Sequence, residues 1–211
     1  MHSPFRHIDS VLRKSRPIHL TFFLTKRCNS RCPFCFYLEN TTSSSQSHNL
    51  TPPPSAPPLK VRGGRGSYEL SLDEIEKISK SFGNLLWLAF SGGEIFLRDD
   101  LVEISKIFYK NNKPAIMLYP TNGLLPELIR EKMEAILRRC GKSTIAVKLS
   151  MDGFGGMHDE IRNTPGSFEK VMKTYEMLGG LLSEYPNFEL GINTVFSSKN
   201  QKDIDEIMDF V

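Results

Sequence analysis

The chain alternates short apolar segments with amphipathic segments, and this alternation constrains the fold more than any other feature. Five segments are short and apolar, and most are rich in β-branched or aromatic residues, as is typical of buried strands. They are residues 18–25, 85–90, 115–119, 144–150 and 188–196. Apolar residues recur at helical spacing after Ser71, Asp99, Pro126 and Ser167, and again around Ile204. Strands joined by crossover helices run parallel, so the sequence predicts an α/β fold with a parallel sheet.

Polar or glycine-containing runs follow four consecutive predicted strands. These runs are residues 28–35, 91–94, 121–123 and 150–153. In parallel α/β folds, ligands bind at the C-terminal ends of the strands, which all lie at one edge of the sheet. We therefore expect the four runs to form one shared site.

The first run contains Cys28, Cys32 and Cys35 in a C-x3-C-x2-C spacing, with no fourth cysteine nearby. Structural zinc sites and ordinary cysteine-ligated [4Fe–4S] clusters use four protein ligands, so a three-cysteine site leaves one coordination position open. His48 lies in a segment rich in proline and serine, and Cys140 ends a predicted helix, where a small buried hydrophobic residue is expected. The spacing favours an iron–sulfur cluster with an open iron over zinc, with zinc as the alternative.

The second run, Gly92-Gly93-Glu94, adjoins a buried strand. Two glycines allow a ligand to approach the backbone closely and leave amides free to donate, and the carboxylate could bind an ammonium group. A tight strand-to-helix turn is the alternative interpretation of the same tripeptide.

Side-chain parity on the fourth predicted strand places Lys148 and Ser150 on the inner face of a closing sheet. Ser150 and Asp152 could then bind a polar cofactor, with a locally hydrogen-bonded turn as the alternative. Lys148 either points at the cofactor from deeper in or pairs with Glu189. Parity also places Asn193 inside.

A predicted loop at 158–168 holds three further polar candidates. His158, Asp159 and Arg162 could contact substrate. We favour a capping and salt-bridge network at the start of the next helix.

Composition sets the remaining limits. The 211 residues, 39% hydrophobic and 24% charged, suit one soluble domain, and a scattered net charge of +3 argues against nucleic acid. No segment suits a membrane span or a signal peptide, so the expected location is cytoplasmic. Residues 1–17 are expected to be an N-terminal extension and 18–211 a core, with a flexible insertion at 40–66 that is rich in serine, proline and glycine.

Taken together, these motifs resemble the radical S-adenosyl-L-methionine (SAM) superfamily. The cysteine motif, with Phe34 before its last cysteine, and the three later runs occur in the matching order over residues 15–211, with the insertion excepted. Residues 150–171 are similar to the SPASM subgroup, many of whose members modify peptides or proteins.

The resemblance implies a partial (β/α)6 TIM-like barrel and a [4Fe–4S] cluster on Cys28, Cys32 and Cys35. SAM would bind the open iron and be cleaved to a 5′-deoxyadenosyl radical that abstracts hydrogen from a substrate. The implied SAM contacts are Gly92, Gly93 and Glu94 at the methionine part, Phe34 near adenine, and Ser150 and Asp152 near ribose, with Thr121 and Asn193 as further candidates. The implied partners are a reducing electron donor such as a flavodoxin or ferredoxin, and a substrate of unknown identity for which peptides are one class.

The sequence departs from the family pattern at two places. Ile95 stands where many members have proline, and the chain ends at Val211 inside a predicted helix, so we expect a core truncated after about five βα units. Two alternatives to radical chemistry remain at this point: an electron-transfer or cluster-carrying protein, and a structural zinc protein.

Overall fold

The computed structural model describes residues 17–36 and 69–210. The predicted insertion at 40–66, His48 and all but the last residue of the predicted N-terminal extension lie outside the described residues. In the described part, no helix is long and apolar enough to cross a membrane.

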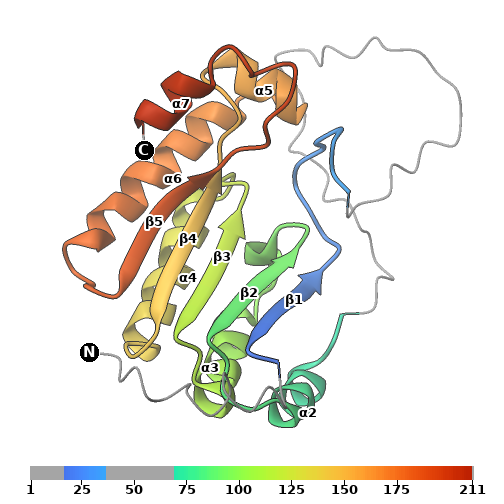
Figure 1. Cartoon of the computed structure of the whole chain (residues 1–211), viewed down its shortest axis with the longest axis vertical. Coiled ribbons are helices and arrows are strands. Elements are labelled where there is room, and N and C mark those ends of the chain that lie inside the picture. Colours follow the sequence, from blue (N-terminus) through green and yellow to red (C-terminus); the bar gives the residue numbers. More distant parts are fainter. Residues whose placement is uncertain (1–16, 37–68, 211) are drawn as a thin grey trace, which may run out of the picture.

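One sheet of five parallel strands forms the centre of the molecule, and its strands lie side by side in chain order (Figure 1). They are β1 (His19–Thr25), β2 (Trp87–Gly92), β3 (Ile116–Thr121), β4 (Thr144–Ser150) and β5 (Phe188–Asn193). The parallel α/β prediction is confirmed, and the sheet is open, with β1 and β5 at its edges, as in a partial TIM-like barrel. The bounds of β4 match the prediction, whereas β2 begins two residues later and runs on to Gly92.

The crossover helices cover one face of this sheet and leave the other face open (Figure 1). They are α2 (Leu72–Ser81), α3 (Leu101–Asn112), α4 (Pro126–Arg139) and α6 (Ser167–Leu182). Ser71 begins α2 with a capping box, in which its hydroxyl accepts from the Glu74 amide and the Glu74 carboxylate accepts from the Ser71 amide.

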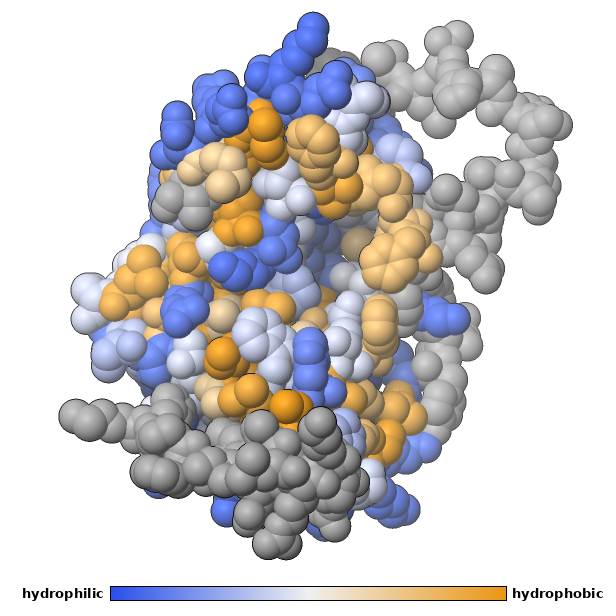
Figure 2. Space-filling model, in the orientation of Figure 1, coloured by the Kyte–Doolittle hydropathy of each residue, from blue (hydrophilic) through white to orange (hydrophobic). Residues whose placement is uncertain are grey.

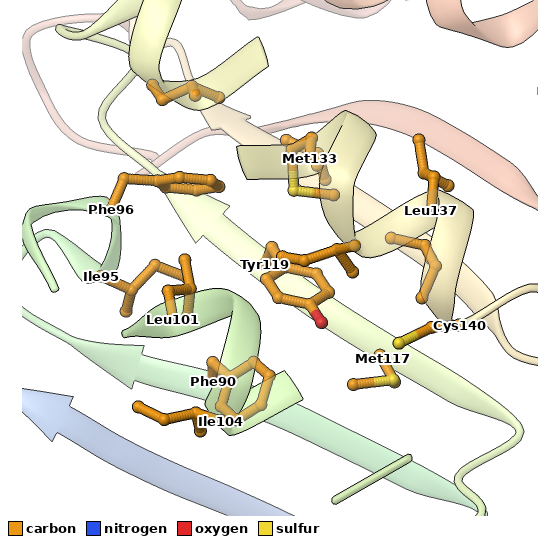
Figure 3. Close-up of a cluster of buried hydrophobic side chains, with 14 of the residues drawn as sticks. Phe90, Ile95, Phe96, Leu101, Ile104, Met117, Tyr119, Met133, Leu137 and Cys140 are labelled. Carbon is orange, nitrogen blue, oxygen red and sulfur yellow. The ribbon is translucent and has the colours of Figure 1, made fainter. Parts of the chain in front are cut away.

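The hydrophobic core lies between the sheet and these helices (Figure 3). Alternate residues of each strand enter it, so that Ile145, Val147 and Leu149 of β4 are buried there while Lys148 faces the opposite side. Tyr119 of β3 is fully buried, and its hydroxyl donates to Ser105 Oγ at 2.9 Å. The parity argument therefore holds, and the open face of the sheet carries the polar set.

The prediction of a loop at 158–168 is partly wrong, because the first residues of this segment belong to a short helix, α5 (Gly156–Arg162). Seven residues after two glycines give too little periodicity to reveal a helix, and the same applies to the 3-10 turn η2 (Ile95–Leu97). The last helix, α7 (Ile204–Phe210), is confirmed. The predicted capping role of Asp159 is also confirmed, since its carboxylate accepts from the Gly166 amide, the Ser167 hydroxyl and the Phe168 amide at the start of α6.

Candidate cluster and cofactor site

The segment that carries the three cysteines, residues 26–36, follows β1 at the C-terminal edge of the sheet, as predicted, and is called the cysteine loop here. Cys28 is buried, whereas Cys32 and Cys35 are half-buried, and the Cys35 amide donates to the Cys32 carbonyl at 3.2 Å. Asn122, which follows β3, places its side-chain nitrogen 3.8 Å from the Cys28 sulfur and 2.7 Å from the Asn29 side-chain oxygen. The ends of β1 and β3 therefore meet at the cysteines.

In the described residues, no three His, Cys, Asp or Glu side chains converge closely enough to hold a single metal ion. Cys28, Cys32 and Cys35 are all free cysteines in the structure.

The two glycines at the end of β2 pack closely against the backbone that leads into the cysteines. A Cβ on Gly93 would lie 2.1 Å from the Arg27 carbonyl oxygen, and one on Gly92, whose φ is +133°, would lie 2.4 Å from that of Thr25. The Gly93 and Glu94 amides donate to these same two carbonyls, each at 2.8 Å. The expectation of free amides is therefore wrong at Gly93 and Glu94, because the glycines let the backbone of residues 25–27 approach closely.

Glu94 joins the end of β2 to the end of β3. Its buried carboxylate accepts from the Thr121 hydroxyl at 2.9 Å, the Asn122 amide at 2.8 Å and the Phe96 amide at 3.1 Å. Burial raises the pKa of Glu94 to about 7, against the lowering effect of these hydrogen bonds. Thr121, predicted as a further cofactor contact, uses its hydroxyl here.

This raised pKa predicts a pH-dependent stability of the cluster-free protein. The folded chain binds the Glu94 proton more tightly than the unfolded chain, so the contribution of this group is fully present below about pH 4.5 and is lost as the pH rises through about 7. We expect it to lower the free energy of unfolding by up to about 3 kcal/mol over this range. Urea denaturation from pH 5 to 8 measures it. Glu94→Gln should flatten the profile, and parallel slopes in the two proteins would contradict the assignment.

The residues predicted near ribose divide into two kinds. Asp152 is fully buried, and its carboxylate accepts from Arg162 Nε at 2.6 Å and from the Val195 amide at 2.7 Å. Ser150 and Asn193, which are opposite each other in the β4–β5 register, make no side-chain hydrogen bond within the described part of the chain. Asp152 thus positions its neighbours, whereas Ser150 and Asn193 have free polar groups on the open face.

Arg162 is the residue whose importance sequence reasoning underestimated. Besides its ion pair with Asp152, its Nη1 lies 3.8 Å from the Cys32 sulfur and its guanidinium lies over the Phe34 ring, 5.5 Å from the centroid. A salt bridge was expected here, but its contact with a residue 130 positions earlier leaves no local signal in the sequence. The end of α5 therefore brings a cation to the cysteine loop.

Cys140 lies apart from this site. It caps the end of α4 within the core, near Met117 (Figure 3), and burial raises its pKa to about 12. Its predicted nature as a small buried hydrophobic residue is confirmed.

We expect Cys140 to resist alkylation in the folded protein, because little thiolate forms and the sulfur is inaccessible. Iodoacetamide at pH 8, followed by peptide mass mapping, should label the half-buried Cys32 and Cys35 and reach Cys140 only in urea. Equal labelling of Cys140 and Cys32 in the native protein would contradict this picture.

Comparison with known proteins gives a consistent result. The profile of the Radical SAM superfamily matches residues 22–211. The chain is 30% identical over 165 residues to the antilisterial bacteriocin subtilosin biosynthesis protein AlbA of Bacillus subtilis, which covers 77% of this chain and 30% of that protein. It is 28% identical over 197 residues to the AdoMet-dependent heme synthase of Methanosarcina barkeri, which covers 92% of this chain and 47% of that protein. The chain thus spans less than half the length of either relative.

Solved structures share the fold. The anSMEcpe structure with bound AdoMet and the Cp18Cys peptide matches with a TM-score of 0.56 at 22% identity, over 90% of this chain and 46% of that one. The structure of Streptococcus suis SuiB bound to the precursor peptide SuiA matches with a TM-score of 0.57 at 17% identity, over 100% of this chain and 42% of that one.

Proposed function

The chain belongs to the radical SAM superfamily, and from this premise we propose that it is the core of an enzyme that abstracts hydrogen from a peptide. SAM and an iron–sulfur cluster are the cofactors of this family. When bound, the reduced cluster supplies the electron that splits SAM into methionine and a 5′-deoxyadenosyl radical. The residues of the chain bind, orient and shield these groups.

The meeting of the cysteine loop with the ends of β2, β3 and α5 is the observation that carries this proposal. Cys28, Cys32 and Cys35 would hold the cluster, since hydrogen-bond donors from Asn122 and Arg162 already lie beside two of the sulfurs. Hydrogen bonds to sulfur are a recurrent feature of such clusters.

The SAM contacts follow from the same geometry. Glu94 places a carboxylate at the end of β2, where it would attract the ammonium of SAM. Phe34, with 39% of its surface exposed, would lie near adenine, largely through its backbone, and Ser150 and Asn193 offer free polar groups to ribose. Gly92, Gly93, Thr121 and Asp152 would act by holding the cysteine loop, Glu94 and Arg162 in place.

The open face of the sheet is where we place the substrate. Figure 2 shows hydrophilic and hydrophobic residues mixed over the part of this face that the described residues form. Lys148 lies there opposite Gly191, its ammonium 2.3 Å from the point that a Cβ on that glycine would occupy. It makes no ion pair within the described residues, so the alternative pairing with Glu189 is not observed. This cation is available to an anionic group of a substrate.

Three relatives support a peptide as that substrate. AlbA is named for the biosynthesis of a bacteriocin, SuiB was solved with a precursor peptide, and anSMEcpe was solved with a peptide and AdoMet. A mixed polar and apolar face is suited to an extended peptide.

Anaerobic reconstitution tests the chemistry. The chain is loaded with iron and sulfide and reduced with dithionite in the presence of SAM, and 5′-deoxyadenosine is measured by chromatography. We expect product from the wild type and from the matched control Cys140→Ala, and none from Cys32→Ala. A colourless zinc protein, or a brown protein that forms no 5′-deoxyadenosine, would overturn the proposal; the second result would favour the electron-transfer alternative.

A second assay tests the substrate class. A synthetic peptide mixture and an iron porphyrin are added separately to the reduced enzyme, and the rate of 5′-deoxyadenosine formation is compared with the rate without substrate. We expect stimulation by peptides. Stimulation by the porphyrin alone would replace the peptide with a tetrapyrrole, the class named for the second relative.

A further inference from the structure

A pair of buried hydroxyl groups lies next to Cys32. The Ser30 hydroxyl is 3.1 Å from the Cys32 sulfur and 3.2 Å from the Thr164 hydroxyl, and both residues are almost fully buried. Thr164 in turn donates to the Arg162 carbonyl at 3.0 Å. Ser30 comes from the cysteine loop and Thr164 follows α5, so this contact joins segments 134 residues apart.

Counting protons fixes the direction of the Ser30–Cys32 contact once a metal is bound. A hydroxyl has one proton to donate, and a cysteine that ligates iron is a thiolate with none. The 3.1 Å contact must then be a hydrogen bond from the Ser30 hydroxyl to the Cys32 sulfur. When Thr164 turns its proton onto Ser30, the Ser30 proton is left to the sulfur. When Thr164 donates to the Arg162 carbonyl, the Thr164 oxygen and the Cys32 thiolate are both acceptors for Ser30, and the charged sulfur forms the stronger, charge-assisted bond.

Ser30 also serves a second sulfur. Its backbone amide hydrogen-bonds the Cys28 sulfur. Two of the three predicted cluster ligands thus have a donor from the same residue. Because Ser30 and Thr164 are buried, water has little access to replace a lost hydroxyl.

We propose that Ser30, backed by Thr164, is a positioning residue that raises the reduction potential of the cluster through its hydrogen bond to Cys32. Reduction adds negative charge that is shared with the ligating sulfurs, and a donor to sulfur stabilises the reduced form more than the oxidised form. The inference rests on the proposed function, because it requires the cluster on Cys28, Cys32 and Cys35.

The test is a redox titration of the reconstituted full chain, followed by electron paramagnetic resonance of the reduced cluster. Ser30→Ala and Ser30→Val remove the hydroxyl donor. Ser30→Thr keeps the hydroxyl on a side chain of the same shape as valine. Ser183→Ala is the control, since it removes an exposed hydroxyl that is bonded to a helix carbonyl. We expect a more negative midpoint potential in the Ala and Val variants, and a wild-type potential in Ser30→Thr and Ser183→Ala. A structural role alone would lower iron content without moving the potential of the clusters that form.

Each of the other possible results would refute either the inference or the proposed function. Loaded Ala and Val variants with the wild-type potential would overturn the inference and leave the proposed function intact. Failure of both variants to assemble a cluster would make Ser30 an assembly residue, which also overturns a tuning role. A wild-type chain that binds no cluster would instead refute the proposed function itself.

Discussion

Gly93→Ala is expected to abolish cluster binding and SAM cleavage, although the glycine bears no side chain that could bind either cofactor. The added Cβ would lie 2.1 Å from the Arg27 carbonyl oxygen and 3.0 Å from the Cys28 Cβ. The first of these is a backbone atom, which cannot rotate away, so the cysteine loop must move. Misplacing a reacting group by about 1 Å can cost roughly 100-fold in rate, and we expect 5′-deoxyadenosine formation to fall by at least that factor.

Iron content per chain and 5′-deoxyadenosine formation after reconstitution are the measurements. Gly141→Ala is the matched control, because a Cβ at that position meets no atom within 4 Å. It should load iron and cleave SAM as the wild type does. Normal iron content in Gly93→Ala would show that the loop approaches β2 less closely than the structure indicates.

Asp152→Asn is expected to lower the free energy of unfolding by about 3–5 kcal/mol, which is the cost of removing the charge of one partner from a buried ion pair. The carboxylate accepts from Arg162 on one oxygen and from the Val195 amide on the other. In either orientation of its side-chain amide, an asparagine points its NH2 group at one of these two donors, so that one of the two hydrogen bonds is lost. It also leaves the Arg162 guanidinium, itself 8% exposed, without a counter-charge.

Urea denaturation of the cluster-free protein at pH 7 measures this loss. Glu160→Gln is the control, since the ion pair between Glu160 and Lys199 is exposed to solvent and its loss should leave the urea midpoint nearly unchanged. Equal midpoints for the two variants would mean that solvent reaches the Asp152–Arg162 pair. Arg162→Met should reproduce most of the loss, because it leaves the Asp152 carboxylate buried without its cation.

The elements that could be predicted from the sequence are those with a strong local signal. β4 and the helices that begin at Pro126 and Ser167 have the predicted starts, because apolar periodicity and capping depend on residues only a few positions apart. The short helix α5 was missed because seven residues carry too little of that signal. The order of the four polar runs also indicated that they lie at one edge of the sheet.

The roles of the residues within that edge depend on contacts between distant parts of the chain. The backbone amides next to the two glycines looked free in the sequence, yet those of Gly93 and Glu94 donate to the carbonyls of Thr25 and Arg27. Arg162 reaches Cys32 from 130 positions away, and Thr164 reaches Ser30 from 134.

By itself, the sequence determined the parallel α/β fold, the three candidate metal-binding cysteines and the membership of the family, because each depends on residue types at short, fixed spacings. Only the tertiary structure decided which polar groups remain free for a cofactor and which hold the cysteine loop. Hydrogen bonds and close backbone contacts are satisfied in three dimensions, and a buried donor takes whatever acceptor the fold brings to it.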